Sequence, residues 1–260
     1  MQGLGGFGNA YGASVENYGG VLGDGAAINH HLVLGAAFSG MGTQTGNSYQ
    51  QVNGRSFGFY GYGIYTQGAL RISGVLGTGY QSYSEQRELH PTGLVASGST
   101  QGWFFGSGAQ AQYTIPLQDH AFLMPYLSAN YLHTGTNAFN EQGAGLLNLN
   151  YGGQSTNLGV FTGGLRAGYA LQGQGLTWTP WVEVGGTGYA GNRLSTTTET
   201  LGLLSTNMAA HIAPADSLDA GAGLTLQGKG PWNAKVGYVG QFSGASAQFN
   251  SFDLIADYRW

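Results

Sequence analysis

The sequence predicts an all-β protein: a closed, antiparallel transmembrane β-barrel of about 12 strands, with short turns at one end and longer loops at the other. Three observations predict it. Charged residues make up only 8% of the chain, against a usual ~25% in water-soluble domains. Aromatic residues make up 13%, and glycine accounts for 49 of the 260 residues. No segment reaches about 18 consecutive apolar residues, so the apolar surface must be spread along strands by alternation.

Alternating stretches recur along the whole chain, separated by turn-rich connections. A strand places successive side chains on opposite faces, so each stretch has one apolar and one polar face. We expect strands over residues 5–14, 18–28, 32–42, 56–65, 69–83, 103–115, 122–134, 157–171, 176–190, 218–227, 231–242 and 251–260. Residues 1–260 then form a single barrel domain.

The length of each connection depends on whether the strand before it is even- or odd-numbered. Those after even-numbered strands are a few residues long, whereas several after odd-numbered strands are long and polar, namely 43–55, 84–100, 135–156 and 191–216. Outer-membrane barrels have short periplasmic turns and longer extracellular loops. An even number of strands also returns the chain to its starting side. We therefore expect the loops outside the cell and both termini of the barrel in the periplasm.

The last stretch, residues 251–260 (SFDLIADYRW), shows the alternation most clearly. One phase carries Phe252, Leu254, Tyr258 and Trp260, and the other carries Asp253 and Asp257. We expect the aromatic phase to meet lipid and the acidic phase to meet the lumen. This strand is expected to pair with the first one, with Trp260 at the periplasmic interface.

Most charges within the predicted strands fall on the phase opposite the apolar residues. An Arg or Lys on the lipid face at mid-depth costs roughly 2–4 kcal/mol, so we expect these side chains to line the pore. The expected set is Arg71, Arg166, Glu183, Lys235, Asp253 and Asp257, with Arg166 and Glu183 able to pair on adjacent strands. The alternative is the solvated face of an open sheet, as in a soluble sandwich.

Glycine recurs on the same inward phase, as at Gly164 and Gly168. Glycine lets a strand bend or lets another backbone approach closely. We therefore expect Gly164 to line the pore and to leave room for a helix or an extended segment. Relief of barrel curvature is a second explanation, compatible with the first.

Composition excludes several other functions. The absence of cysteine excludes disulfides and thiolate metal sites, and a net charge of -4 without a basic stripe argues against a nucleic-acid partner. His30 and His31 are adjacent on a turn, which is poor geometry for a metal, so we expect no metal and no cofactor. The first residues lack a positive region followed by an apolar one, so a signal sequence is expected upstream.

Short motifs follow one another in a distinctive order. They are residues 19–24 (GGVLGD), 34–37 (LGAA), 124–126 (MPY) with Tyr131, 164–169 (GLRAGY), 179–181 (TPW), 219–224 (DAGAGL) and 258–260 (YRW). Their order and spacing resemble the translocator β-domain of type V autotransporters, secreted proteins of Gram-negative bacteria. The resemblance covers essentially the whole chain.

The resemblance implies an outer-membrane barrel that passes a covalently attached N-terminal passenger, through or with the barrel, to the cell surface. In the family a helix or linker spans the pore ahead of the first strand, and residues 1–4 do not supply it. The resemblance also implies two further partners, outer-membrane lipid and the barrel-assembly machinery. The assembly signal would be Phe252, Leu254, Tyr258 and Trp260. No Asn-Asn junction of the kind that some members cleave is evident.

Two other functions stay open. A stand-alone channel is one, although a barrel of about 12 strands is narrow beside porins of 16–18 strands. A lipid hydrolase is the other, because barrels of this size include an outer-membrane phospholipase. That chemistry needs a His and a Ser two residues apart on an outward face, and His133 is followed by Thr134 and Gly135. We therefore expect no enzymatic activity.

Overall fold

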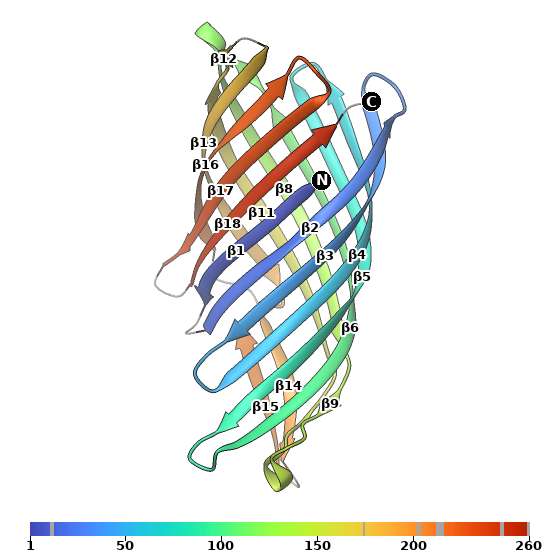
Figure 1. Cartoon of the computed structure of the whole chain (residues 1–260), viewed down its shortest axis with the longest axis vertical. Helices are drawn as coiled ribbons and strands as arrows, with labels where there is room; N and C mark the ends of the chain where they lie inside the picture. The colour runs from blue at the N-terminus through green and yellow to red at the C-terminus, as the bar shows by residue number, and fades with distance from the viewer. Residues whose placement is uncertain (11–12, 174, 202–203, 212–215, 245–246, 259–260) are drawn as a thin grey trace.

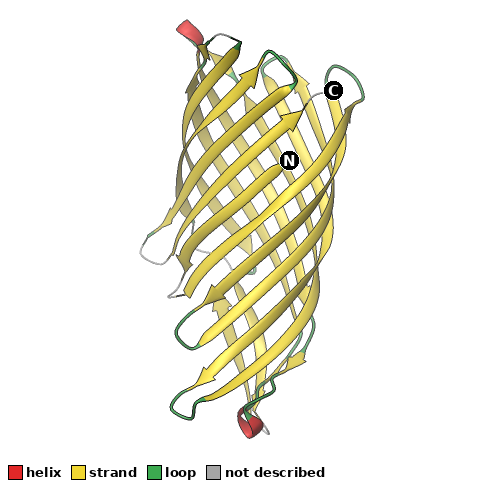
Figure 2. Ribbon diagram, in the orientation of Figure 1, coloured by secondary structure: helices red, strands yellow, loops and turns green. Residues whose placement is uncertain are grey.

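The computed structural model describes residues 1–10, 13–173, 175–201, 204–211, 216–244 and 247–258. The chain forms a tall, closed β-barrel whose strands are strongly tilted (Figure 1 and Figure 2). Among the described residues, no helix is long and apolar enough to cross a membrane.

Twelve strands make the barrel wall, each antiparallel to the next. They are β1 (Gln2–Ala10), β2 (Ala13–Ala27), β3 (Leu32–Gly46), β4 (Gln50–Gln67), β5 (Leu70–Leu89), β6 (Leu94–Tyr113), β8 (Ala121–Thr136), β11 (Gln154–Tyr169), β13 (Leu176–Gly191), β16 (Ser217–Gly228), β17 (Trp232–Ser243) and β18 (Ala247–Tyr258). β18 pairs with β1, from Gln2 opposite Ile255 to Ala10 opposite Ala247. This pairing closes the barrel, so the predicted fold class is confirmed.

Large apolar side chains lie exposed on the outer face of the wall. Aromatic residues form two bands on this face. One band, nearer the short turns, contains Tyr65, Tyr113, Tyr169, Trp178, Trp232 and Tyr258; the other contains Tyr18, Phe57, Tyr80, Trp103 and Tyr131. Trp232 and Tyr258 meet edge to face, with ring centroids 4.7 Å apart. Two aromatic girdles flanking an apolar band are the outer surface that a bilayer requires of a barrel.

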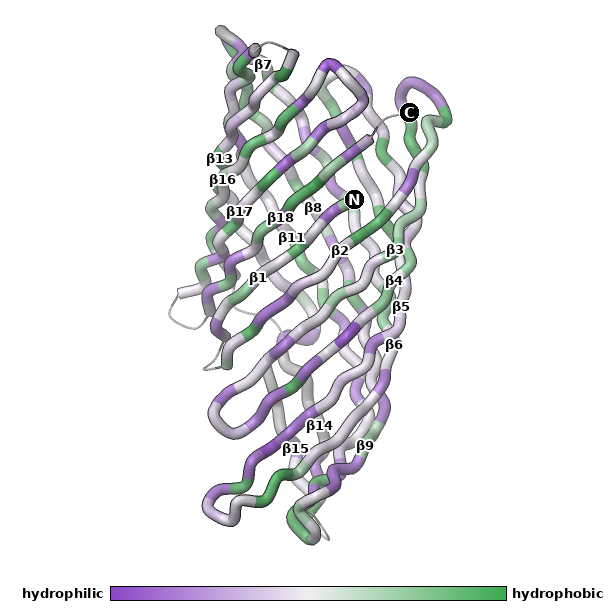
Figure 3. The backbone as a smooth tube through the Cα atoms, viewed as in Figure 1, coloured by the Kyte–Doolittle hydropathy of each residue, from purple (hydrophilic) through white to green (hydrophobic). Residues whose placement is uncertain are grey.

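Three of the predicted long loops are mostly strand, and one of them, 191–216, holds the hairpin of β14 (Leu194–Leu201) and β15 (Leu204–His211). β3 runs on to Gly46 and β4 starts at Gln50, while β5 runs to Leu89 and β6 starts at Leu94, so residues 43–55 and 84–100 are mostly hairpin. Beyond Tyr80 the outward residues of β5 turn polar, with Ser82, Ser84, Gln86 and Glu88, and the lower parts of the front strands are hydrophilic in Figure 3. The backbone ladder continues past the apolar band because it needs hydrogen bonds and not apolar side chains.

The turn between the first two strands also comes earlier in the sequence than expected. Glu16 and Asn17, which we expected in a connection, lie within β2 and face Phe7 and Gly6 of β1. The first strand ends at Ala10 and not at residue 14. Polar residues near a barrel rim fit a strand as well as a turn, because that end of the strand lies outside the apolar band.

The two ends of the barrel differ. Among the described residues, the short-turn end carries the short elements β7 (Ile115–Pro116), a 3-10 turn (Gln118–His120) and β12 (Leu171–Gln172) in addition to the turns themselves. At the other end a second sheet of order β15-β14-β10-β9 is formed by β9 (Phe139–Asn140), β10 (Asn150–Tyr151), β14 (Leu194–Leu201) and β15 (Leu204–His211). The loop 137–153 also holds a second 3-10 turn (Gly145–Leu147).

The wall is not equally high around its circumference. β5 and β6 have 20 residues each, whereas β16, β17 and β18 have 12 each and β1 has nine. The long strands extend toward the end that carries β14, β15 and β9 (Figure 1). That end of the barrel therefore has a high side and a low side.

Candidate functional site in the barrel interior

Alternate side chains of each strand face the inside of the barrel. A cavity of about 560 Å³ identifies this inner face, because residues of β1 to β5 and of β18 line it together, among them Leu4, Ala37, Tyr62 and Ile255. Met1 lines the same cavity and is tied to β18 by two backbone hydrogen bonds of 2.9 Å with Ala256. The amino end of the barrel thus opens onto a largely apolar part of the interior.

Inward glycines lie beneath aromatic side chains of neighbouring strands. A Cβ on Gly164 would stand 2.6 Å from the Tyr126 hydroxyl oxygen, and one on Gly168 would stand 2.5 Å from the Phe122 ring. The space that we expected Gly164 to leave open is therefore occupied by Tyr126. The glycines give the interior its aromatic lining because a ring can lie flat only where the next strand has no side chain.

Charged residues gather around Trp181, whose side chain is 4% exposed. The Arg166 guanidinium of β11 donates from Nε and Nη2 to Glu183 Oε2 of β13, at 2.9 and 2.6 Å. The predicted Arg166–Glu183 pair is therefore present. Val182 and Val184, which flank Glu183, are more than half exposed on the outer face, so the acidic side chain stands on the inner phase.

A second ion pair lies near the same indole. Lys235 Nζ of β17 is 3.2 Å from Asp253 Oδ2 of β18. The Arg166 guanidinium carbon is 4.2 Å from the Trp181 ring centroid, and Lys235 Nζ is 5.2 Å from it. Cations over an indole face are attracted by the ring quadrupole. Two cations, two carboxylates and one indole thus form a net-neutral ladder across β11, β13, β17 and β18.

The two remaining predicted charges stand apart from this ladder. Arg71 lines a cavity with Ser73, Tyr62 and Asn130, nearer the short-turn end. Asp257 lines the cavity that contains Met1 and Ile255. The inner wall therefore carries charge at several levels and not in a single ring.

The last strand presents the predicted apolar phase on the outside. Phe252, Leu254 and Tyr258 are each more than 40% exposed there. The Phe252 ring lies 5.1 Å from the Tyr238 ring and 6.2 Å from the Phe7 ring, centroid to centroid, so it bridges β17, β18 and β1. Trp260, the fourth residue of the expected assembly signal, lies outside the described residues.

A family model described as the autotransporter β-domain matches residues 1–239. The chain belongs to the autotransporter β-domain family. It is accordingly an outer-membrane translocator domain, and neither a stand-alone channel nor a lipid hydrolase is favoured. Translocator domains of autotransporters are transport units. No curated protein matched the chain in a sequence comparison.

Solved autotransporter barrels have the same fold. The translocator domain of NalP from Neisseria meningitidis matches with a TM-score of 0.80 at 16% identity, over 100% of this chain and 87% of that one. The β-domain of the Bordetella autotransporter BrkA matches with a TM-score of 0.68 at 15% identity, over 100% and 97%. The transport unit of AIDA-I from Escherichia coli matches with a TM-score of 0.69 at 12% identity, over 100% and 89%.

His133 and Asn157 form a hydrogen-bonded pair on the wall of the autotransporter barrel. His133 Nδ1 lies 2.8 Å from Asn157 Oδ1, and the His133 ring packs 4.7 Å from the Trp103 ring. The next residue on the same phase of β8 is Gly135, so no nucleophile stands where a serine hydrolase of this geometry would need one. Among the described residues, no three His, Asp or Glu side chains are grouped to hold a metal ion.

Sequence reasoning missed a buried polar cluster at the high end of the autotransporter barrel. Arg87 of β5 donates to both carboxylate oxygens of Glu141 in the loop 137–153, at 3.0 and 2.6 Å. The Tyr151 hydroxyl donates to Glu85 Oε1 at 3.1 Å, and the Tyr151 ring stacks on Phe139, with centroids 4.5 Å apart. Both partner segments were expected to be loops, and nothing in their sequence pairs Arg87 with a residue 54 positions away.

Proposed function

We propose that this barrel carries an N-terminal passenger through its interior to the cell surface. The observation that carries the proposal is the position of Met1, which lines the inner cavity beside Leu4 and Tyr62. A segment joined ahead of Met1 would therefore begin at the wall, next to this inner cavity. The short turns then lie in the periplasm with both ends of the barrel, and the loops 137–153 and 192–216 lie outside the cell, as in barrels of this type.

In this proposal the pore is lined by Arg71, Arg166, Glu183, Lys235, Asp253 and Asp257, with Gly164 beneath Tyr126. The ladder around Trp181 is net neutral, so it offers no strong barrier to a passing chain of either charge. Pairing also offsets part of the cost of holding single charges within the wall. Residues 1–260 act as one domain, and the barrel has no catalytic role.

The direct test is surface display. An epitope-tagged reporter, preceded by a signal sequence, is fused ahead of Met1 and expressed in a Gram-negative host. We expect antibody binding and protease cleavage of the reporter on intact cells. The control is the same reporter without the barrel, which stays in the periplasm. A reporter that remains protected while the barrel is folded in the outer membrane would refute the proposal.

We also propose that the outer phase of β18, Phe252, Leu254 and Tyr258 together with Trp260, is read by the barrel-assembly machinery. Deleting Trp260 should then slow insertion, measured as the delay before the barrel becomes heat-modifiable on gels. The matched control deletes one residue of the loop 137–153. An unchanged insertion rate after loss of Trp260 would remove the terminal aromatic residue from the signal.

A further inference from the structure

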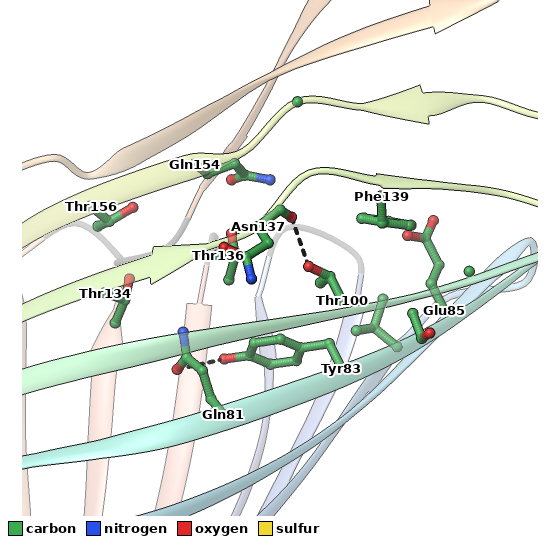
Figure 4. A pocket seen from close by; sticks show the side chains of 14 residues that line it. Gln81, Tyr83, Glu85, Thr100, Thr134, Thr136, Asn137, Phe139, Gln154 and Thr156 are labelled. Atoms are coloured by element: carbon green, nitrogen blue, oxygen red, sulfur yellow. Dashed lines mark hydrogen bonds between the residues drawn. The ribbon is translucent and has the colours of Figure 1, made fainter.

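A second cavity, of about 380 Å³, lies at the high end of the barrel beyond Tyr80. It is bounded by the inner faces of β4, β5, β6, β8 and β11 and by the loop 137–153 (Figure 4). Four threonines and three carboxamide residues line it, together with the rings of Tyr83 and Phe139. Glu85 is the one charged residue among those that line it. The cavity is thus rich in groups that donate and accept hydrogen bonds.

Gln81 brings an unused donor to this cavity. The residue is 5% exposed, and its Oε1 accepts a hydrogen bond from the Tyr83 hydroxyl at 3.1 Å. That bond orients the amide and turns Nε2 toward the side of the cavity where Thr134 lies (Figure 4). Within the described part of the chain, Gln81 Nε2 has no hydrogen-bond partner. Buried polar groups are nearly always hydrogen-bonded to protein or ordered water, so this donor is available to an acceptor on a water molecule or a bound ligand.

Glu85 brings a buried carboxylate that forms no ion pair among the described residues. It accepts hydrogen bonds at Oε1 from Gln50 Nε2 at 2.5 Å and from the Tyr151 hydroxyl at 3.1 Å. The nearby cation Arg87 donates hydrogen bonds from Nε and Nη2 to Glu141. Burial, and the neighbouring Glu141 carboxylate, raise the pKa of Glu85 above its ordinary value. Glu199 on β14 adds a further carboxylate to the same group, and its pKa is also raised.

We propose that this cavity binds an extended polypeptide segment that carries a basic side chain beside Glu85. A backbone carbonyl would accept from Gln81 Nε2, and an ammonium or guanidinium group would neutralise Glu85. A neutral glycan would satisfy the hydroxyl and amide groups but would leave the carboxylate uncompensated. The inference rests on the proposed function, because the segment would be the part of the passenger that occupies the exit.

The absence of cysteine from the chain permits a direct test. In the folded barrel in detergent, Thr136→Cys places one thiol in the cavity, and Thr225→Cys places one on the distant inner face of β16. The probe is the peptide Gly-Gly-Lys-Gly-Cys, blocked at both ends and carrying an activated disulfide. Its counterpart has Glu in place of Lys. Cross-linking yield is read by mass spectrometry.

We expect the Lys peptide to cross-link to Thr136→Cys at least several-fold faster than the Glu peptide, and Thr225→Cys to show no such preference. Adding Glu85→Gln, which keeps the hydrogen-bonding shape, should abolish the preference. Adding Glu88→Gln, an exposed carboxylate of the same strand, should leave it intact. Equal rates for both peptides, or a preference that survives Glu85→Gln, would overturn the proposal.

Two further outcomes separate this inference from the proposed function. If the reporter reaches the cell surface but the peptides show no preference, translocation stands and the cavity is not a peptide site. If a neutral disaccharide such as maltose slowed the thiol modification of Thr136→Cys, and the Lys peptide without its activated disulfide did not, the cavity would be assigned to a glycan. That result would overturn the proposal. Heat-modifiability of every variant verifies that the barrel is folded.

Discussion

The most completely buried carboxylate of the described cluster is Glu141, whose side chain has no exposed surface. It accepts two hydrogen bonds from Arg87 and one from the Leu149 backbone nitrogen at 2.7 Å. These bonds join a loop to a barrel strand across 54 residues of sequence. Removing one partner of such a pair is costly because the other charge stays buried.

Glu141→Gln should therefore loosen the loop 137–153 without unfolding the barrel. Breaking a buried ion pair costs roughly 3–5 kcal/mol, and the partial exposure of Arg87 places the expected loss at the lower end of that range. Hydrogen exchange of the loop amides measures the loss as a fall in opening free energy. Glu88→Gln, on the exposed face of β5, is the control and should change nothing. Unaltered exchange in Glu141→Gln would mean that the pair does not hold the loop.

The loop should also respond to pH through Glu85. Its carboxylate faces Gln50, Tyr151, Glu141, Arg87 and Glu199, and burial raises its pKa in the folded state. A raised carboxyl pKa means that the folded state binds more protons than the unfolded state. The contribution of Glu85 to stability is therefore present at low pH and is lost as pH rises through the folded pKa.

Opening free energies from hydrogen exchange, corrected for intrinsic rates, should then be larger near pH 5.5 than near pH 7.5. The Glu85→Gln variant should reduce this difference to the part contributed by Glu199, whose pKa is raised in the same direction. Equal opening free energies of the loop at both pH values in the parent protein would contradict the assignment of the pH dependence to Glu85. A difference between the two pH values that Glu85→Gln leaves unchanged would contradict it as well.

At the scale of elements, alternation decided which residues face out. Phe252 and Leu254 on one phase, with Asp253 on the other, were predictable from sequence, because a period of two is local. The lengths of β5 and β6 were not predictable in this way. Outside the apolar band both faces of a strand are polar, so the pattern that marks a strand disappears although its ladder of hydrogen bonds continues.

The phases of β18 can be tested with adjacent single cysteines. Ser251→Cys should react with a membrane-impermeant thiol reagent in liposomes, because Ser251 shares the phase of Asp253. Phe252→Cys should be protected by lipid, because Phe252 is exposed only on the outer face. Reaction rates are followed by mass shift. A faster reaction at position 252 would reverse the assignment of the two faces.

The packing of rings on glycines predicts a specific loss of folding stability. Gly164→Val should displace Tyr126 and destabilise the barrel by about 1–3 kcal/mol, a usual cost of overpacking. Adding Tyr126→Ala should restore part of the loss by vacating the site. Gly61→Val is the control, since a Cβ there meets nothing within 4 Å. Urea unfolding in detergent gives the stabilities, and equal stability of Gly164→Val and the parent would contradict the packing.

At the scale of the whole molecule, composition was the strongest guide. A chain with 8% charged residues has too few charges for a water-exposed surface of its size, and the structure places its apolar residues on the outside. Strand number and closure followed from the same alternation. The cluster around Glu85 could not be predicted, because it depends on how two long connections fold over the inner wall. Contacts between loops that are distant in sequence produce no periodic pattern in the sequence.

The outer surface predicts dependence on detergent. Purified in a mild detergent, the protein should be monodisperse in size-exclusion chromatography with light scattering. After detergent removal it should aggregate, because the aromatic and aliphatic band loses its apolar solvent. A chain that stays monodisperse in buffer alone would be inconsistent with a membrane barrel.

Because one side of the wall is higher than the other, the mouth of the barrel is asymmetric in the plane of the membrane. β5 and β6 rise as a screen on one side, while β16–β18 and β1 end low on the other. If a passenger leaves through this mouth, as proposed, it would meet water first over the low side and would be released in a fixed direction relative to the strands. The first part of the passenger to fold would then always lie beside the same strands. Every copy would hold its passenger in the same orientation relative to its own barrel.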